Sequence, residues 1–361
     1  MKQTSTGPRV ARSGGALLVA LWALASQAQV VDEADVRARA AGLAATLAAE
    51  LSRHCPAADP ADSAAFDSCR LALYRDSQFK RSLQDFVLWG RQRDPRLTLK
   101  ESTLTQFGPD VLTGMYVPLF MFDGRYSVDE GLHEGLVRIR LHTAFRNGLA
   151  PGQFPYPFWH DAEKWAHYEK ASQIILHWDP KTARVKVAQF SIFGSEPPIV
   201  ATRSVTPPPF DGRWRWTDAQ GRSQPVVTVF DGLMDAANPY IGQLDEAYKR
   251  LALRLRENQC LECHVPSNPD HSKRLVLLQT PMHAAAEIKR LMESVRKDRM
   301  PRDEAGIEAP LEAHAKAVLL QEGAEFERVL DQARRWEDSR TAVAGATTTR
   351  QGPLPPPVSG R

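Results

Sequence analysis

After its first 30 residues, the chain opens with two stretches whose apolar residues recur every three or four positions. In the alanine-rich segment 31–54, Leu43, Leu47 and Leu51 share one side, which predicts a helix. A second helix is predicted over 63–92, where aliphatic and aromatic residues are dense. The segment between them contains two prolines and two aspartates, so we expect a loop and a helical hairpin.

From residue 97 onward, short runs rich in β-branched and aromatic residues predict strands. The turn sequence DPKT at 179–182 predicts a hairpin between the strands expected at 173–178 and 185–192. A proline-rich link follows at 205–210, and a turn signal at 218–221 separates two further short strands. The predicted strands are 116–122, 136–141, 173–178, 185–192, 213–217 and 226–230.

A helical pattern returns at residue 238. Leu244, Tyr248 and Leu251 lie on one apolar stripe, which predicts a helix that ends just before Cys260. Further helices are predicted over 282–296 and 309–338. The chain therefore has an expected α+β fold, with an N-terminal helical hairpin plus antiparallel β domain followed by an all-α domain.

The expected boundaries are a signal peptide at 1–28, an α+β domain of unknown function at 30–235, the all-α domain at 238–338 and a disordered tail at 339–361. The tail is assigned because this segment lacks aliphatic periodicity and is rich in Pro, Thr and Gly. With 43% hydrophobic and 25% charged residues among 361, the chain is long enough and apolar enough for two globular domains.

The first residues are typical of a secretory signal. Lys2, Arg9 and Arg12 precede the apolar run 16–25, and small residues before position 29 predict cleavage after Ala28. A retained membrane anchor is the alternative, although ten apolar residues are too few to span a bilayer comfortably. We expect a periplasmic protein with no transmembrane segment after signal cleavage.

Charge excludes one class of partner. The chain has 46 Lys and Arg against 43 Asp and Glu, and three of the cations lie in the predicted signal peptide. The mature chain would therefore have no formal net charge, so we expect no nucleic-acid partner.

The four cysteines form two pairs with different spacing. Cys55 and Cys69 flank the loop of the predicted helical hairpin. In an oxidising compartment these two thiols are expected to form a disulfide that joins the two helices.

Cys260, Cys263 and His264 form the sequence CLECH, which matches the CxxCH attachment motif of c-type haem. Two thiols at this spacing can each bond one vinyl group of a porphyrin, and the following imidazole can ligate the iron. A redox dithiol is the alternative, but such motifs follow a strand in a βαβ unit, whereas this motif follows an amphipathic helix. A zinc site would need another Cys or His pair at matching spacing, and none is evident.

The segment 238–338 resembles a class I, monohaem cytochrome c domain. It has a helix leading into CxxCH, a loop, a helix ending in Met300-Pro301, and a C-terminal helix that would cross the first. The resemblance covers less than a third of the chain. It implies one covalent haem c, attached through Cys260 and Cys263, with His264 as proximal and Met300 as distal ligand.

Other residues could take the distal position or contact the haem. Met292 beside Leu291 is better explained as core packing. His283 could ligate the iron or bind a propionate. The remaining rivals for the ligand are Met282, His271 and His314, and the candidate propionate partners are Lys273, Arg274 and Arg299.

The upstream domain matches no family that we can name. Its aromatic segment 154–168 contains His160 and His167 at two helical turns, which is better explained as a packed corner than as a ligand site. His133, His142 and His177 are scattered and show no ligand spacing.

The sequence favours an exported electron-transfer cytochrome over a catalyst, with an unidentified redox partner protein and possible docking through the upstream domain. Met/His ligation leaves the iron no open position, which suits electron transfer. The alternatives are a periplasmic haem oxidoreductase whose upstream domain binds the substrate, and a haem-based sensor or ligand-binding protein.

Overall fold

The computed structural model of the chain describes residues 33–102, 104–149, 162–202, 216–217, 223–224, 233–264, 281–303 and 305–348. The predicted signal peptide, the proline-rich link, the predicted strand at 226–230 and residues 349–361 lie outside these ranges. Within them, no helix combines the length and the apolar character needed to cross a membrane.

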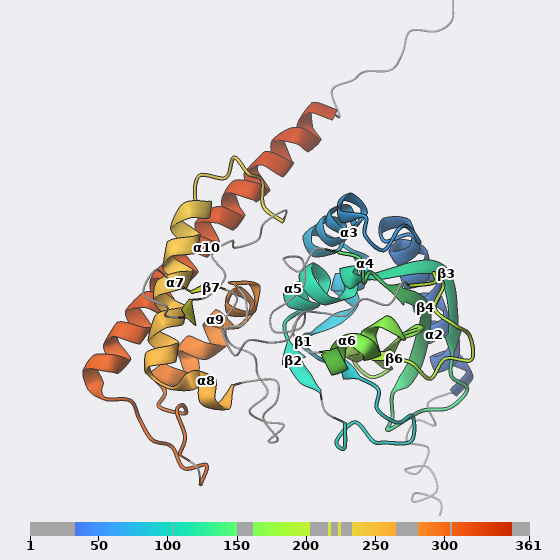
Figure 1. Cartoon of the computed structure of the whole chain (residues 1–361), viewed down its shortest axis with the longest axis horizontal. Coiled ribbons are helices and arrows are strands. Elements are labelled where there is room, and N and C mark those ends of the chain that lie inside the picture. The colour runs from blue at the N-terminus through green and yellow to red at the C-terminus, as the bar shows by residue number, and fades with distance from the viewer. Residues whose placement is uncertain are drawn as a thin grey trace, which may run out of the picture.

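The N-terminal part combines helices with a six-stranded sheet (Figure 1). Its first helices are α2 (Glu33–His54), α3 (Ser63–Arg75) and α4 (Gln78–Ser82), and its first strands are β1 (Leu83–Arg91) and β2 (Thr105–Phe107). Three helical turns follow, α5 (Pro109–Val111), η1 (Leu112–Tyr116) and η2 (Val117–Leu119). The remaining elements are β3 (Phe120–Val128), β4 (Val137–Phe145), α6 (Ala162–Glu169), β5 (Gln173–Asp179) and β6 (Arg184–Ser191).

The sheet is mixed, with the strand order β2-β1-β6-β5-β4-β3. Strands β3, β4, β5 and β6 form an antiparallel meander, and the predicted 179–182 hairpin joins β5 to β6. Strand β1, however, pairs with β6 in parallel, with Trp89 opposite Ala188. The expectation of a purely antiparallel domain is therefore wrong at this one pairing, because β1 comes from the segment that we predicted to be helical.

The predicted helix over 63–92 is interrupted. Asp76 is extended and ends α3, and the Ser77 side chain accepts a hydrogen bond from Lys80 N to cap the short helix α4. The chain then forms β1, in which Val87 and Trp89 are buried on alternate positions. Dense apolar residues fit either a helix or a buried strand, and here cross-strand pairing decides for the strand.

The strand predicted at 116–122 begins later than expected. Residues up to Leu119 continue the helical turns η1 and η2, and β3 starts at Phe120. A second, two-stranded sheet pairs β7 (Trp216–Thr217) with β8 (Ser223–Gln224), and the turn predicted at 218–221 lies outside the described residues.

Helix α2 packs across β3 and β4, and the core lies between them (Figure 1). Its buried positions include Leu47 and Leu51, two of the residues that predicted the helix. An aromatic cluster fills the core where β1, β3, β4, β6 and α6 converge. Its members are Trp89, Tyr116, Phe120, Phe145, Tyr168 and Phe190.

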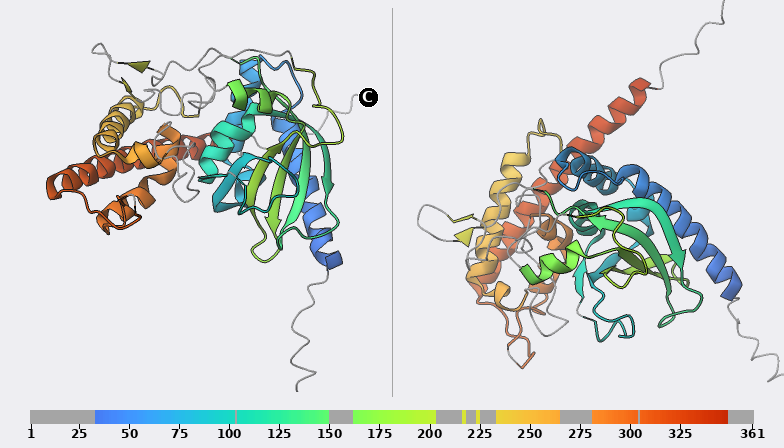
Figure 2. Two further views of the ribbon diagram at one scale, coloured as in Figure 1. Left: turned by 60° about the horizontal axis from the view of Figure 1, so that its bottom comes forward. Right: turned by 45° about the vertical axis from the view of Figure 1, so that its right-hand side comes forward.

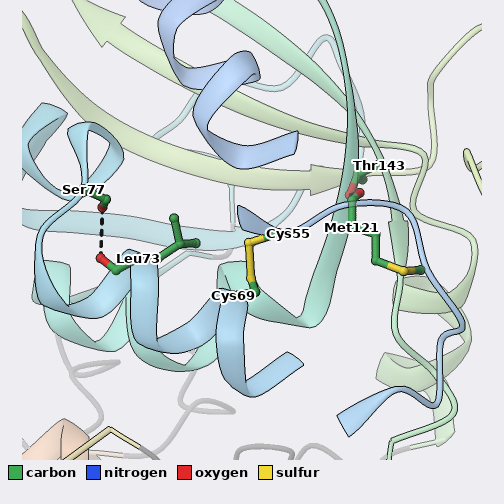
Figure 3. Close-up of a disulfide and its surroundings, with 6 residues drawn as sticks. All are labelled: Cys55, Cys69, Leu73, Ser77, Met121 and Thr143. Carbon is green, nitrogen blue, oxygen red and sulfur yellow. Dashed lines mark hydrogen bonds between the residues drawn. A yellow bond between two sulfur atoms is a disulfide. The ribbon is translucent and has the colours of Figure 1, made fainter. Parts of the chain in front are cut away.

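A disulfide joins Cys55, at the end of α2, to Cys69 on α3, as predicted (Figure 3). Both cysteines are fully buried. The Cys55 carbonyl also accepts a hydrogen bond from Phe122 N at 2.8 Å, so the covalently closed hairpin is anchored to β3.

The C-terminal part contains α7 (Ile241–Glu257), the short α8 (Cys260–Cys263), α9 (Pro281–Arg296) and α10 (Ala313–Thr348). All of the stripe that predicted α7 is buried, including Leu244, Tyr248 and Leu251. Helix α10 continues ten residues past its expected end, so residues 339–348, which we predicted to be disordered, are helical. Its C-terminal end extends beyond the other helices of this part (Figure 1, and the right-hand view of Figure 2).

The two parts of the chain touch along α9 and α10. Arg290 of α9 lies over the Phe86 ring at 4.3 Å, and Met282 packs against Gly114. Arg334 of α10 donates to Asp110 at 3.0 Å. The helical part is therefore packed against the same side of the sheet domain that carries α5 and η1.

Candidate functional site

Helix α7 leads directly into a short turn that contains the CxxCH sequence. Asn258 caps the C-terminal end of α7 and donates its backbone N–H to Arg254 O at 3.0 Å. Gln259 then takes a left-handed conformation (φ 58°), and the chain re-enters a helix at Cys260. His264 closes this turn by donating its backbone N–H to Cys260 O at 3.1 Å. One turn thus holds both cysteines and the histidine.

Cys260 and Cys263 carry thiols rather than a disulfide, and both are half-buried. Burial raises the pKa of the Cys260 thiol to about 11. A reactive dithiol instead needs a lowered thiol pKa in an electropositive setting. Cys260 is therefore poorly suited to be the nucleophile of a disulfide oxidoreductase.

Helices α7 and α10 run antiparallel, and their contacts fix the register. Near the start of α7, Asn238 donates to Ala333 O at 3.0 Å. Further along, Tyr248 meets Phe326 at 6.2 Å between ring centroids, and Arg250 donates to Glu322 at 2.9 Å. Each step forward on α7 is matched by a step back on α10, so Cys260 lies beyond the end of α7 that faces the start of α10.

The loop that carries Met300 is anchored at this same end. Met300 is half-buried and lies between α9 and α10. Lys316, in the first turn of α10, donates to Asp298 Oδ1 at 2.6 Å. Figure 1 likewise shows α8 and the loop after α9 at one end of the helical part. The structure therefore brings the CxxCH turn and Met300 to one end of the α7–α10 pair, from positions 36 residues apart in the sequence.

The loop beyond Met300 is closed on itself by backbone hydrogen bonds. Asp303 N donates to Ile307 O at 2.8 Å, and Ala309 N donates to Pro301 O at 3.1 Å.

The resemblance implied that the C-terminal helix would cross the first helix of this part. Instead, α10 runs antiparallel along α7, because apolar residues of both helices are buried against each other over several turns.

Two rival methionines are committed to the core. Met282 is 5% exposed and its sulfur fills the space above Gly114. Met292 is 3% exposed and packs against α10 at Gly323, as its sequence context predicted. Met300 is the half-buried member of the three.

The histidines that could replace Met300 as iron ligand differ in their burial. His283 is 1% exposed, lies edge-on to Tyr116 at 6.1 Å between ring centroids, and has its pKa lowered to about 3 by burial. It faces the sheet domain. His314 is exposed in the first turn of α10, and His271 lies outside the described residues.

Of the candidate propionate partners, Arg299 lies within the described residues. Arg299 is half-exposed and pairs with Glu293 at 3.5 Å. Lys273 and Arg274 lie outside the described residues. Of the two histidines in the upstream aromatic segment, His160 also lies outside them, and His167 lies on α6.

The structure reveals groupings that the sequence did not indicate. His133 and His177 approach within 6.2 Å between ring centroids, and His177 hydrogen-bonds to Gln189 at 2.9 Å. An open groove of about 780 Å³ crosses the sheet beside Arg125, Arg140, His142 and Glu196. The buried ionisable side chains include Arg146 and Glu287. No local sequence pattern predicts these groupings, because each depends on contacts between segments that are far apart in the sequence.

The donor set of the C-terminal site fits a covalent c-type haem: two thiols in one turn, an adjacent imidazole, and a thioether at the same end of the helices. Within the described ranges, no group of three or more His, Cys, Asp or Glu residues could hold a metal ion. Comparisons with protein-family models, curated proteins and solved structures find no match to this chain.

Proposed function

We propose that this protein is an exported monohaem c-type cytochrome that transfers single electrons to and from a redox partner. The observation that carries this proposal is the turn Cys260–His264, which holds two thiols and an imidazole at the same end of the α7–α10 pair as the Met300 loop. Cys260 and Cys263 would form the thioether bonds, and His264 and Met300 would ligate the iron. When bound, the haem would supply a one-electron carrier whose potential is raised by Met/His ligation.

The chain's own residues would hold and orient that group. The left-handed Gln259 and the His264–Cys260 hydrogen bond fix the turn, so both thiols are presented by the same short helix. The Lys316–Asp298 pair restrains the loop that carries Met300, whose thioether would be the second protein ligand of the iron. A closed ligand set favours electron transfer over ligand sensing.

Export is part of the proposal. Residues 1–28 would direct the chain to the periplasm, and the Cys55–Cys69 disulfide is the kind of bond that persists in an oxidising compartment. The sheet domain would then dock the redox partner or place the haem relative to it.

The test is an absorption spectrum of the protein matured in a host that attaches haem c, recorded oxidised and after reduction with dithionite. We expect a sharp reduced α band and a weak oxidised band from iron–methionine charge transfer. Replacing Cys260 and Cys263 with alanine should abolish covalent haem.

Met300→Ala should remove the charge-transfer band, and Met292→Leu serves as the matched control because Met292 packs in the core. A charge-transfer band that survives in Met300→Ala would reject Met300 as the ligand. A high-spin spectrum that responds to carbon monoxide in the unmutated protein would favour the sensor or oxidoreductase alternatives. Absence of covalent haem would overturn the proposal.

A further inference from the structure

Arg146 is a buried cation at the C-terminal end of β4. Its side chain is 0% exposed, and it is the largest of the fully buried side chains in the described ranges. Within that part of the chain, none of its three guanidinium nitrogens has a hydrogen-bond partner. Burial lowers the pKa of Arg146 to about 10, so the guanidinium is still charged at neutral pH. A buried charge is unfavourable unless an opposite charge compensates it.

The backbone around Arg146 is fixed. Its N–H donates to Leu119 O at 2.8 Å, which ties the end of β4 to η2. Two residues later, Gly148 lies so close to the loop before α3 that a Cβ atom would be 2.9 Å from Ala61 N. Arg146 cannot reach solvent by a simple shift of its own backbone.

The carboxylate that acts electrostatically on Arg146 belongs to Asp62. Asp62 is exposed, and its side chain accepts a hydrogen bond from Ala65 N at 2.9 Å as the N-cap of α3. It forms neither an ion pair nor a hydrogen bond with Arg146 in the described structure. In the described residues, no carboxylate is therefore hydrogen-bonded to the Arg146 guanidinium.

We propose that Arg146 is the anchor of an anion-binding site in the sheet domain, which takes the carboxylate or phosphate group of a small ligand. The guanidinium presents five N–H donors in a planar fork, and this geometry matches two oxygens of a carboxylate or a phosphate. A desolvated, charge-assisted pair of hydrogen bonds would satisfy the buried nitrogens. The site is independent of the haem proposal, because it rests on the sheet domain alone.

The experiment measures thermal unfolding of the full mature protein at neutral pH and constant ionic strength. Sodium chloride is the reference, and sodium phosphate, sulfate, acetate and citrate are the probes. At an anion concentration about a hundred times the dissociation constant, the midpoint should rise by about 5 °C. A larger rise of the unfolding midpoint with phosphate and sulfate than with acetate and citrate would indicate a phosphate ligand, and the reverse order would indicate a carboxylate ligand.

Arg146→Met keeps the length of the side chain and removes the charge. We expect this variant to lose the anion response and, in chloride alone, to be at least as stable as the unmutated protein. Arg125→Met is the matched control: Arg125 is 52% exposed and pairs with Asp123 and Glu196, so its loss should leave the response intact.

If Arg146→Met does not fold, Arg146→Lys tests the same point by titration calorimetry with the anion that acts best. Lysine keeps the charge and loses the fork, so binding should weaken at least tenfold. The proposal is overturned if no probe stabilises the unmutated protein beyond chloride, if Arg146→Met responds equally, or if Arg146→Lys binds unchanged.

Discussion

Lys316 of α10 donates a hydrogen bond to Asp298 Oδ1 at 2.6 Å, and this contact holds the loop before Met300 against the start of α10. Both side chains are partly screened from solvent, with 23% and 40% exposed. The same helix end faces the CxxCH turn. The pair therefore links helix packing in the C-terminal part to the position of the proposed distal ligand.

Lys316→Met should loosen this loop. A partly buried ion pair is worth about 1 kcal/mol, so the fixed conformation of the loop should lose roughly fivefold in population. In the haem-loaded protein we expect a weaker iron–methionine charge-transfer band. Lys297→Met is the control, because Lys297 pairs with Glu293 at 2.6 Å and does not reach α10. Equal weakening in both variants would show that the Lys316–Asp298 contact has no specific effect.

Replacing Cys55 and Cys69 together with serine should destabilise the sheet domain. The bond closes a loop with a sequence separation of 14 residues and thereby restricts the unfolded chain. Removing it should lower the free energy of unfolding by about 3 kcal/mol, because the unfolded chain regains this conformational entropy. The midpoint of urea unfolding should fall accordingly, and a reducing agent should reproduce the effect in the unmutated protein. An unchanged midpoint after confirmed reduction would mean that packing of α2 on β3 suffices without the bond.

The sequence was most informative where one local signal decides the outcome. The stripe through Leu244 and Leu251 predicted α7, and the DPKT turn predicted the β5–β6 hairpin. In both cases the conformation is determined by residues that are close together in the sequence. The spacing of Cys55 and Cys69 around a proline-containing loop likewise predicted the disulfide.

Prediction failed where distant residues decide. Leu83–Arg91 has enough apolar residues for a buried helix, and only its pairing with β2 and β6 makes it a strand. The burial of Arg146 was equally invisible, since nothing near it in sequence says which loop will cover the end of β4. For the candidate site, the sequence indicated Cys260, Cys263, His264 and Met300, whereas the approach of the two segments depends on the register of α7 against α10.

Gly148→Ala should destabilise the protein through a backbone clash. A Cβ atom at this position would lie 2.8 Å from Ala61 Cβ and 2.9 Å from Ala61 N, so the loop before α3 would have to move. Overpacking of this kind costs about 1–3 kcal/mol in free energy of unfolding. Gly42→Ala is the control: nothing lies within 4 Å of its added methyl group on helix α2, and it should stabilise by up to about 1 kcal/mol. Equal effects in both variants would mean that the contact at Ala61 is easily relieved.

His177 should make the sheet domain sensitive to acid. It is 1% exposed, and burial lowers its pKa to about 4, against an ordinary value of 6.5. Between these two values the unfolded chain binds a proton that the folded chain does not, so stability falls as pH falls and is unaffected by this group above about 6.5. The full effect of this one group is roughly 3 kcal/mol.

His177→Gln keeps a donor for Gln189 and should reduce the slope of unfolding free energy against pH, as measured by urea titration at a series of pH values. His283, whose pKa burial lowers in the same direction, should contribute a further part of the slope. An unaltered slope in His177→Gln would mean that His177 does not contribute to the acid sensitivity.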